Sequence, residues 1–199
     1  MFYRFARSVL WLLFHLLFHV RSTGKENLPA GGGYIVASNH RTQCDPVFIG
    51  ICIRPTLTFM AKIELFRIPF VGWIIRWLGA FPVERGKGDT GAVDFAKQTV
   101  RSGKVLAMFP EGTRSKDGKL QRLKSGCTVI ASATNAQVVP VAIRFGEKLR
   151  FRSRVEVCFG KPISPEELGV DPAAPSTIKG GNRLIGGRIA ALLEAPASQ

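Results

Sequence analysis

Acidic residues are scarce in this chain of 199 residues. Asp and Glu total 14 against 28 Lys and Arg, which gives a formal net charge of +14. A cationic surplus of this size indicates a polyanionic partner, and both nucleic acid and anionic lipid qualify. The hydrophobic content of 46% excludes global disorder, and the length suits one domain with a full core.

Paired cysteines are absent as well. Cys44, Cys52, Cys127 and Cys158 are scattered through apolar or loop segments and form no C-x-x-C pair. This spacing indicates neither a zinc site nor a disulfide framework, and it fits a reducing cytoplasm.

The sequence also lacks an apolar run long enough to span a bilayer at its N-terminus. Residues 9–20 are 12 in number and include His15 and His19, whereas a spanning helix needs about 20 apolar residues. Residues 21–25 offer no small-x-small cleavage site, which argues against a signal peptide. With Arg4 and Arg7 ahead of the run, we expect residues 1–26 to form a retained interfacial helix. The two histidines are expected to make a polar stripe on it, because no third metal ligand is evident.

Apolar strand patterns alternate with helical patterns along the rest of the chain, and we find no internal repeat. Strands are expected at residues 34–38, 56–61, 79–85, 105–108, 138–145 and 155–159. Helices are expected at residues 46–53, 92–102 and 120–134, with a last amphipathic helix after the Pro/Gly/Ser-rich loop 171–181. The alternation predicts one α/β domain over residues 27–199, with a mixed, largely parallel sheet flanked by helices. Functional groups of such a domain gather on the loops after strands.

Residues 65–78 are a second interfacial candidate. They interleave aromatic and aliphatic side chains with Arg67 and Arg76, the mixture typical of a lipid headgroup layer. A core helix whose arginines extend to solvent explains the same pattern.

The loop after the first of these strands carries His40 and Asp45 in the spacing H-x-x-x-x-D. On a continuous helix they would point roughly 140° apart, so they can meet only if the chain turns. Pro46 supplies the turn and makes Asp45 a natural N-cap for residues 46–53, where it stays ionised. A carboxylate beside an imidazole indicates a general base, and without a G-x-S-x-G elbow the hydroxyl it deprotonates can belong to a substrate. The alternative is a structural loop histidine beside an ordinary helix cap.

A second polar loop, F-P-E-G-T-R-S at residues 109–115, follows the strand at 105–108. From Glu111 to Lys124, two carboxylates face five cations. This loop should attract phosphate, although a solvated charge run has the same composition.

Taken together, these segments resemble the 1-acyl-glycerol-3-phosphate (lysophosphatidate) acyltransferase family. Four blocks occur in the family's order: N-H-x-x-x-x-D at residues 39–45, an arginine-terminated segment at 79–85, F-P-E-G-T-R-S at 109–115 and a V-P-V strand at 139–141. Four ordered blocks are far more specific than one histidine–aspartate spacing. Arg41 and Thr42 stand where many relatives have glutamine and serine.

The resemblance implies a role for each matching residue. His40 would deprotonate the sn-2 hydroxyl of lysophosphatidate and Asp45 would orient it, so that an acyl thioester is attacked and phosphatidate forms. Residues implied to bind the glycerol phosphate are Arg85, Glu111, Gly112, Thr113 and Arg114. Glu111 is expected to steady an arginine, because a carboxylate beside phosphate is otherwise repulsive. Supporting roles are implied for Asn39, Lys62 and Pro140.

The implied partners are the phospholipid bilayer, lysophosphatidate, and acyl carrier protein or coenzyme A as the acyl thioester. No metal, bound cofactor or nucleic acid is expected, and the enzyme would be peripheral or monotopic on the cytoplasmic face of the membrane. Three alternatives stay open: another acceptor such as lyso-ornithine lipid or another lysophospholipid, a noncatalytic lipid-binding relative, and a basic nucleic-acid-binding module. The chain lacks a recognised nucleic-acid motif, and its aromatic residues lie in apolar helices, which argues against the nucleic-acid-binding module.

Overall fold

The computed structural model describes residues 2–69, 71–77, 79–83, 90–171 and 174–196. Among these residues, seven strands form one sheet in the order β1-β7-β6-β2-β5-β3-β4, and every neighbouring pair except β6–β7 is parallel. The strands are β1 His19–Thr23, β2 Ile35–Ser38, β3 Leu57–Lys62, β4 Ala80–Val83, β5 Val105–Met108, β6 Val138–Arg144 and β7 Arg154–Phe159. The predicted α/β class with a mixed, largely parallel sheet is confirmed.

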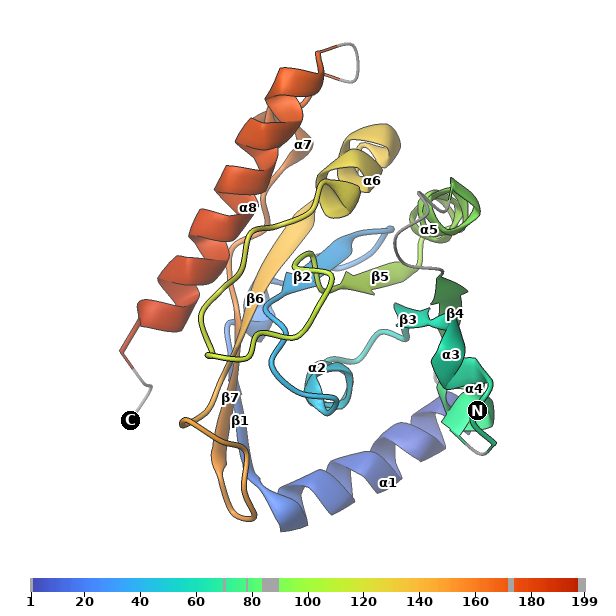
Figure 1. The fold of residues 1–199 in the computed structure, drawn as a ribbon, viewed down its shortest axis with the longest axis vertical. Coiled ribbons are helices and arrows are strands. Elements are labelled where there is room, and N and C mark those ends of the chain that lie inside the picture. Colours follow the sequence, from blue (N-terminus) through green and yellow to red (C-terminus); the bar gives the residue numbers. More distant parts are fainter. Residues whose placement is uncertain (1, 70, 78, 84–89, 172–173, 197–199) are drawn as a thin grey trace.

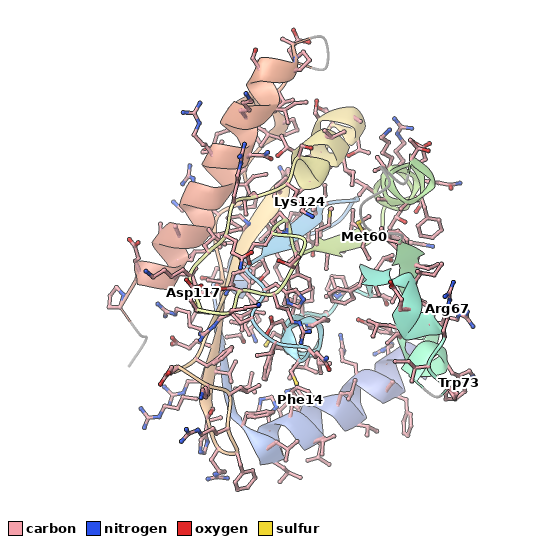
Figure 2. The ribbon with its side chains drawn as sticks, viewed as in Figure 1. Phe14, Met60, Arg67, Trp73, Asp117 and Lys124 are labelled. Atoms are coloured by element: carbon pink, nitrogen blue, oxygen red, sulfur yellow. The ribbon has the colours of Figure 1, made fainter. Side chains whose placement is uncertain are left out.

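Helices cover both faces of the sheet (Figure 1). The helical segments are α1 Phe2–Leu17, the 3-10 turn η1 Lys25–Asn27, α2 Asp45–Cys52, α3 Ile63–Phe66, α4 Val71–Trp77, α5 Thr90–Arg101, α6 Gly126–Thr134, α7 Pro165–Leu168 and α8 Pro175–Glu194. One apolar cluster joins α5, α6 and α8 to one face, and a second joins α1 and α2 to the other. Figure 2 shows Phe14 pointing from α1 toward α2, where its ring meets that of Phe48 edge-on at 5.2 Å.

The strand order brings two distant loops together. β2 and β5 are neighbours in the sheet and run parallel, with Ala37 opposite Met108. The loops that begin at Asn39 and Phe109 therefore leave the same edge of the sheet side by side. This is the edge where α/β proteins place their binding and catalytic groups.

The N-terminal segment differs from the expectation. The helix ends at Leu17, and residues 19–23 form β1, which pairs with β7 in the sheet. His19 therefore lies on a strand, and the predicted helical stripe of His15 and His19 is wrong. The apolar run that suggested one continuous helix is shared between a helix and an edge strand.

Three further helix predictions need correction. The predicted helix 120–134 begins only at Gly126, the segment 65–78 contains the end of α3 and then α4, and the last helix begins at Pro175 inside the predicted loop. In a helix from residue 120, Lys124 N–H would donate to the carbonyl of residue 120, but it donates to the Pro110 carbonyl instead, while Gln121 N–H donates to Glu111. Among the described residues, no helix combines the length and the apolar character needed to cross a bilayer.

Candidate active site

Asn39 attaches the start of the His40 loop, residues 39–45, to the sheet. The β2–β6 ladder ends at Ser38 opposite Val141. Beyond it, the Asn39 amide takes the place of a strand backbone, because its Oδ1 accepts from Ile143 N–H at 2.8 Å and its Nδ2 donates to the Ile143 carbonyl at 3.1 Å. The side chain is buried, so these two bonds fix where the next residue, His40, begins.

His40 and Asp45 meet at this loop, as the sequence predicts. The His40 Nδ1 lies 2.8 Å from Asp45 Oδ2, and 12% of the His40 side chain is exposed against none of the Asp45 side chain. The predicted capping role of Asp45 is wrong, however. The N-cap is Cys44, and Asp45 is the first residue of α2 with Pro46 behind it.

The Asp45 carboxylate turns back toward the loop. It accepts from the backbone N–H groups of Arg41 at 2.6 Å and Thr42 at 2.8 Å, and from the Thr42 hydroxyl at 2.6 Å. Three nitrogen donors, that of the imidazole included, meet Oδ2 and the Thr42 hydroxyl meets Oδ1, so the carboxylate acts as an acceptor on both oxygens. Nδ1 of His40 therefore carries the proton, and Nε2 is the ring nitrogen that can accept one.

Phe109 completes the setting of the imidazole. Its ring stacks on that of His40 with centroids 4.1 Å apart and planes inclined by 20°. The same loop, residues 109–115, also binds the backbone of His40, because the His40 carbonyl accepts from Ser115 N–H at 2.7 Å. Motif matching assigns no role to Phe109, Thr42 or Ser115, because their contribution depends on contacts between two loops.

Glu111 braces the His40 loop through backbone hydrogen bonds. Its Oε1 accepts from His40 N–H at 2.6 Å and its Oε2 accepts from Gln121 N–H at 2.8 Å. The residue is 3% exposed; burial raises the pKa of its carboxyl group, and the two backbone donors act in the opposite direction. Glu111 thus bridges two backbone segments, and the expected steadying of an arginine stays a prediction, since Arg85 lies outside the described residues.

Removing this bridge should destabilise the protein. We expect Glu111→Ala to lower the free energy of unfolding by about 1–3 kcal/mol, because it leaves two backbone N–H groups without their acceptor. Urea unfolding followed by circular dichroism measures the change. Glu147→Ala, at an exposed position, is the matched control and should leave stability unchanged; equal stability of both variants would contradict the bridging role.

The remaining residues of the second loop form a cationic rim. Gly112 has a backbone φ of +72°, a conformation that favours glycine; a Cβ there would also lie 2.8 Å from the end of the flexible Lys124 side chain. Thr113 and Arg114 are exposed. Both line the apolar cavity described below and a second depression, which Lys119 also lines. The rim thus presents hydroxyl and cationic groups beside His40.

Three predicted site residues remain: Pro140, Lys62 and Arg85. Pro140 is buried inside β6 opposite Ala37, and its carbonyl accepts from Gly160 N–H at 2.8 Å. Lys62 is the last residue of β3, and its side chain is outside the described part of the structure. Arg85 also lies outside the described residues. The assigned roles of these two cations stay predictions.

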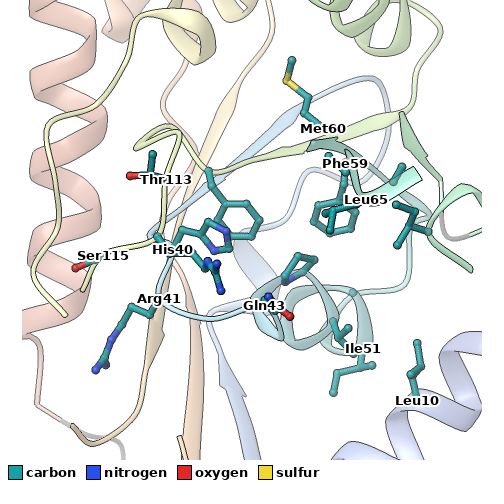
Figure 3. A pocket seen from close by; sticks show the side chains of 18 of the residues that line it. Leu10, His40, Arg41, Gln43, Ile51, Phe59, Met60, Leu65, Thr113 and Ser115 are labelled. Atoms are coloured by element: carbon teal, nitrogen blue, oxygen red, sulfur yellow. The ribbon is translucent and has the colours of Figure 1, made fainter. Parts of the chain in front are cut away.

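An apolar cavity of about 770 Å³ opens beside the imidazole. Figure 3 shows His40 and Arg41 at one end and Phe59, Met60 and Leu65 at the other. The apolar walls come from α1, α2, β3, α3 and α4: Leu10, Val47, Ile51, Phe59, Met60, Leu65 and Ile75. The site therefore joins a base, a cationic rim and a chain-sized apolar space.

A histidine paired with a carboxylate beside an apolar cavity suits acyl transfer to a hydroxyl group, and the comparisons point to that class of protein. The family model "Acyltransferase" matches residues 19–144. The 1-acyl-sn-glycerol-3-phosphate acyltransferase of Bacillus subtilis is 30% identical over 86% of this chain and 87% of its own. The enzyme of the same name from Streptococcus pneumoniae is 32% identical over 84% of this chain and 65% of its own.

A solved structure extends the likeness to the whole fold. The crystal structure of the 1-acyl-sn-glycerophosphate (LPA) acyltransferase PlsC from Thermotoga maritima has a TM-score of 0.76 and 26% sequence identity, covering 99% of this chain and 83% of that one. The chain belongs to the acyltransferase family.

Proposed function

We propose that this protein transfers a fatty acyl group from an acyl thioester to the sn-2 hydroxyl of lysophosphatidate, which yields phosphatidate for phospholipid biosynthesis. The single observation that carries the proposal is the oriented His40–Asp45 pair at the mouth of the apolar cavity, beside the rim of residues 113–116. The relatives named above, which are 1-acyl-sn-glycerol-3-phosphate acyltransferases, support this choice of acceptor.

The chemistry follows from the geometry of the pair. Nε2 of His40 takes the proton of the acceptor hydroxyl, and Asp45 stabilises the imidazolium that results. The alkoxide oxygen attacks the thioester carbonyl. The tetrahedral intermediate then collapses, the C–S bond breaks, and the departing thiolate takes the proton from His40. The acyl chain occupies the apolar cavity during this exchange.

The phosphate of the acceptor binds at the cationic rim, where the planar Arg114 guanidinium can donate two hydrogen bonds to its oxygens.

The test of the proposed function compares acceptors with purified enzyme. Lysophosphatidate should be preferred to lysophosphatidylcholine and to lyso-ornithine lipid, and Arg114→Lys should raise KM for lysophosphatidate more than it lowers kcat. Preference for an acceptor without a phosphomonoester would contradict the assignment. Offering acyl carrier protein and coenzyme A thioesters separately identifies the donor.

Cys44 should have no part in the reaction. Burial, and secondly the neighbouring Asp45 carboxylate, raise the pKa of its thiol, which keeps it protonated and a poor nucleophile. We expect Cys44→Ala to change kcat by less than about threefold, because the capping contacts of Cys44 use its backbone carbonyl. Initial rates of thiol release measure this. A loss as large as that of a His40 variant would indicate an acyl-cysteine intermediate.

The protein should work at the cytoplasmic face of the membrane, as a peripheral or monotopic enzyme. Lysophosphatidate and phosphatidate carry acyl chains that stay in the bilayer, and α1 exposes apolar side chains including Phe5 and Leu16. The net charge of +14 favours anionic lipid.

A further inference from the structure

The turn between β6 and β7 exposes an aromatic side chain among cations. In this hairpin tip, residues 145–153, Phe151 is 73% exposed, more than the other exposed large apolar residues of the described chain. Four exposed cations surround it in the sequence: Lys148, Arg150, Arg152 and Arg154. Glu147 is the one acid between residues 145 and 154. An exposed aromatic residue between basic ones is the composition of a contact with the interface of an anionic membrane.

The outer face of α1 is an apolar stripe. Phe5, Val9, Leu12 and Leu16 are 67%, 49%, 57% and 61% exposed. At 3.6 residues per turn they fall within roughly 60° of one another, and Phe14, which packs on α2, points to the opposite side. The helix therefore buries one face in the protein and leaves the other face without a protein layer among the described residues.

The hairpin tip continues this stripe. Arg152 N–H donates to the Leu17 carbonyl at the end of α1 at 2.7 Å, and His19 N–H donates to the Ser153 carbonyl at 2.9 Å. Figure 1 shows the tip beside the C-terminal end of α1, at the bottom of the view. Phe151 and the stripe thus belong to neighbouring parts of one side of the molecule.

We propose that the hairpin tip is a second membrane contact, in which Phe151 enters the headgroup layer and its four flanking cations bind anionic phospholipids. This inference rests on the proposed function only in that the bilayer holds the substrate. An anionic bilayer suits the surface better than an acidic protein, because the apex of the tip is apolar and adjoins the apolar stripe of α1.

The same hairpin is attached to the His40 loop. The Arg41 guanidinium donates to the carbonyls of Phe145, Gly146 and Glu147 at 2.9–3.1 Å and lies 4.0 Å from the centroid of the Phe145 ring. Arg41 also donates its backbone N–H to Asp45. A membrane-bound tip would therefore hold the His40 loop at a fixed position relative to the headgroups, where the acceptor hydroxyl lies.

Vesicle binding without substrates tests the proposal. Phe151→Ser and the double variant Arg150→Glu/Arg152→Glu are compared with wild type by cosedimentation, on vesicles of phosphatidylcholine alone or with about a quarter phosphatidylglycerol. On the anionic vesicles we expect each to bind about tenfold more weakly than wild type. The matched control is Lys179→Glu/Arg183→Glu on α8, which changes the net charge equally and should stay within about twofold of wild type. Phe151→Trp should bind at least as tightly as wild type.

Wild-type affinity of the Phe151→Ser and Arg150→Glu/Arg152→Glu variants would overturn the proposal. So would an equal loss in the α8 control, which would show that only the total charge matters. Loss of binding to acidic acyl carrier protein with vesicle binding intact would assign the tip to that protein instead. Because no turnover is measured, failure of the wild-type enzyme to acylate lysophosphatidate would contradict the proposed function and leave this result standing.

Discussion

Replacing His40 by alanine should lower kcat for phosphatidate formation by about 10³–10⁴-fold, because the variant loses the base that Asp45 orients. KM for lysophosphatidate should change little, since its phosphate binds at the rim of residues 113–116. The measurement is the initial rate of phosphatidate formation in detergent mixed micelles. Stability should fall only slightly, because Asp45 keeps its three bonds from Arg41 and Thr42.

The control for this variant is His19→Ala. His19 is exposed on β1 and should retain wild-type rates. A His40→Ala enzyme that keeps even a tenth of the wild-type kcat would remove His40 from the mechanism and return it to the alternative of a structural loop histidine.

Asp45→Asn should lower kcat by about 10²–10⁴-fold through a different cause. An amide has one oxygen to accept hydrogen bonds, whereas the Asp45 carboxylate accepts four. The amide group would meet at least one donor with its own N–H₂, and the His40 tautomer would no longer be fixed. Because Asp45 is fully buried, we also expect a loss of about 1–3 kcal/mol in the free energy of unfolding.

Parallel kinetics and urea unfolding separate these two effects. Asp94→Asn on α5 is the control, since Asp94 is an exposed partner of Lys97. If Asp45→Asn were destabilised but fully active below its unfolding midpoint, the carboxylate would be a structural element only.

The sequence was sufficient to predict the class of fold and the two loops of the site. The prediction that a turn before Pro46 brings His40 and Asp45 together is confirmed. The exchange of a capping role for a loop-binding one was not predictable, because helix signals do not say which N–H groups lie nearest the carboxylate. In the structure the N–H groups of Arg41 and Thr42 lie nearest the Asp45 carboxylate, because Asn39 holds the loop against β6.

Other differences come from long-range pairing. Residues 19 and 20 end the apolar run that predicts a helix, and pairing with β7, more than a hundred residues away, places residues 19–23 in a strand. Glu111 lies in a motif, yet its partners are backbone N–H groups of His40 and Gln121, which any residue type could supply. The strand order that places β2 beside β5 likewise has no local signal.

The central claim is direct transfer to lysophosphatidate under control of His40. The most direct measurement follows thiol release from an acyl thioester by wild-type enzyme, with and without lysophosphatidate, alongside the intact mass of the protein. The account predicts that thiol is released only with lysophosphatidate, in equal amount to the phosphatidate formed, and that the mass of the protein stays unchanged. Thiol release without the acceptor, together with a protein heavier by one acyl group, would contradict it.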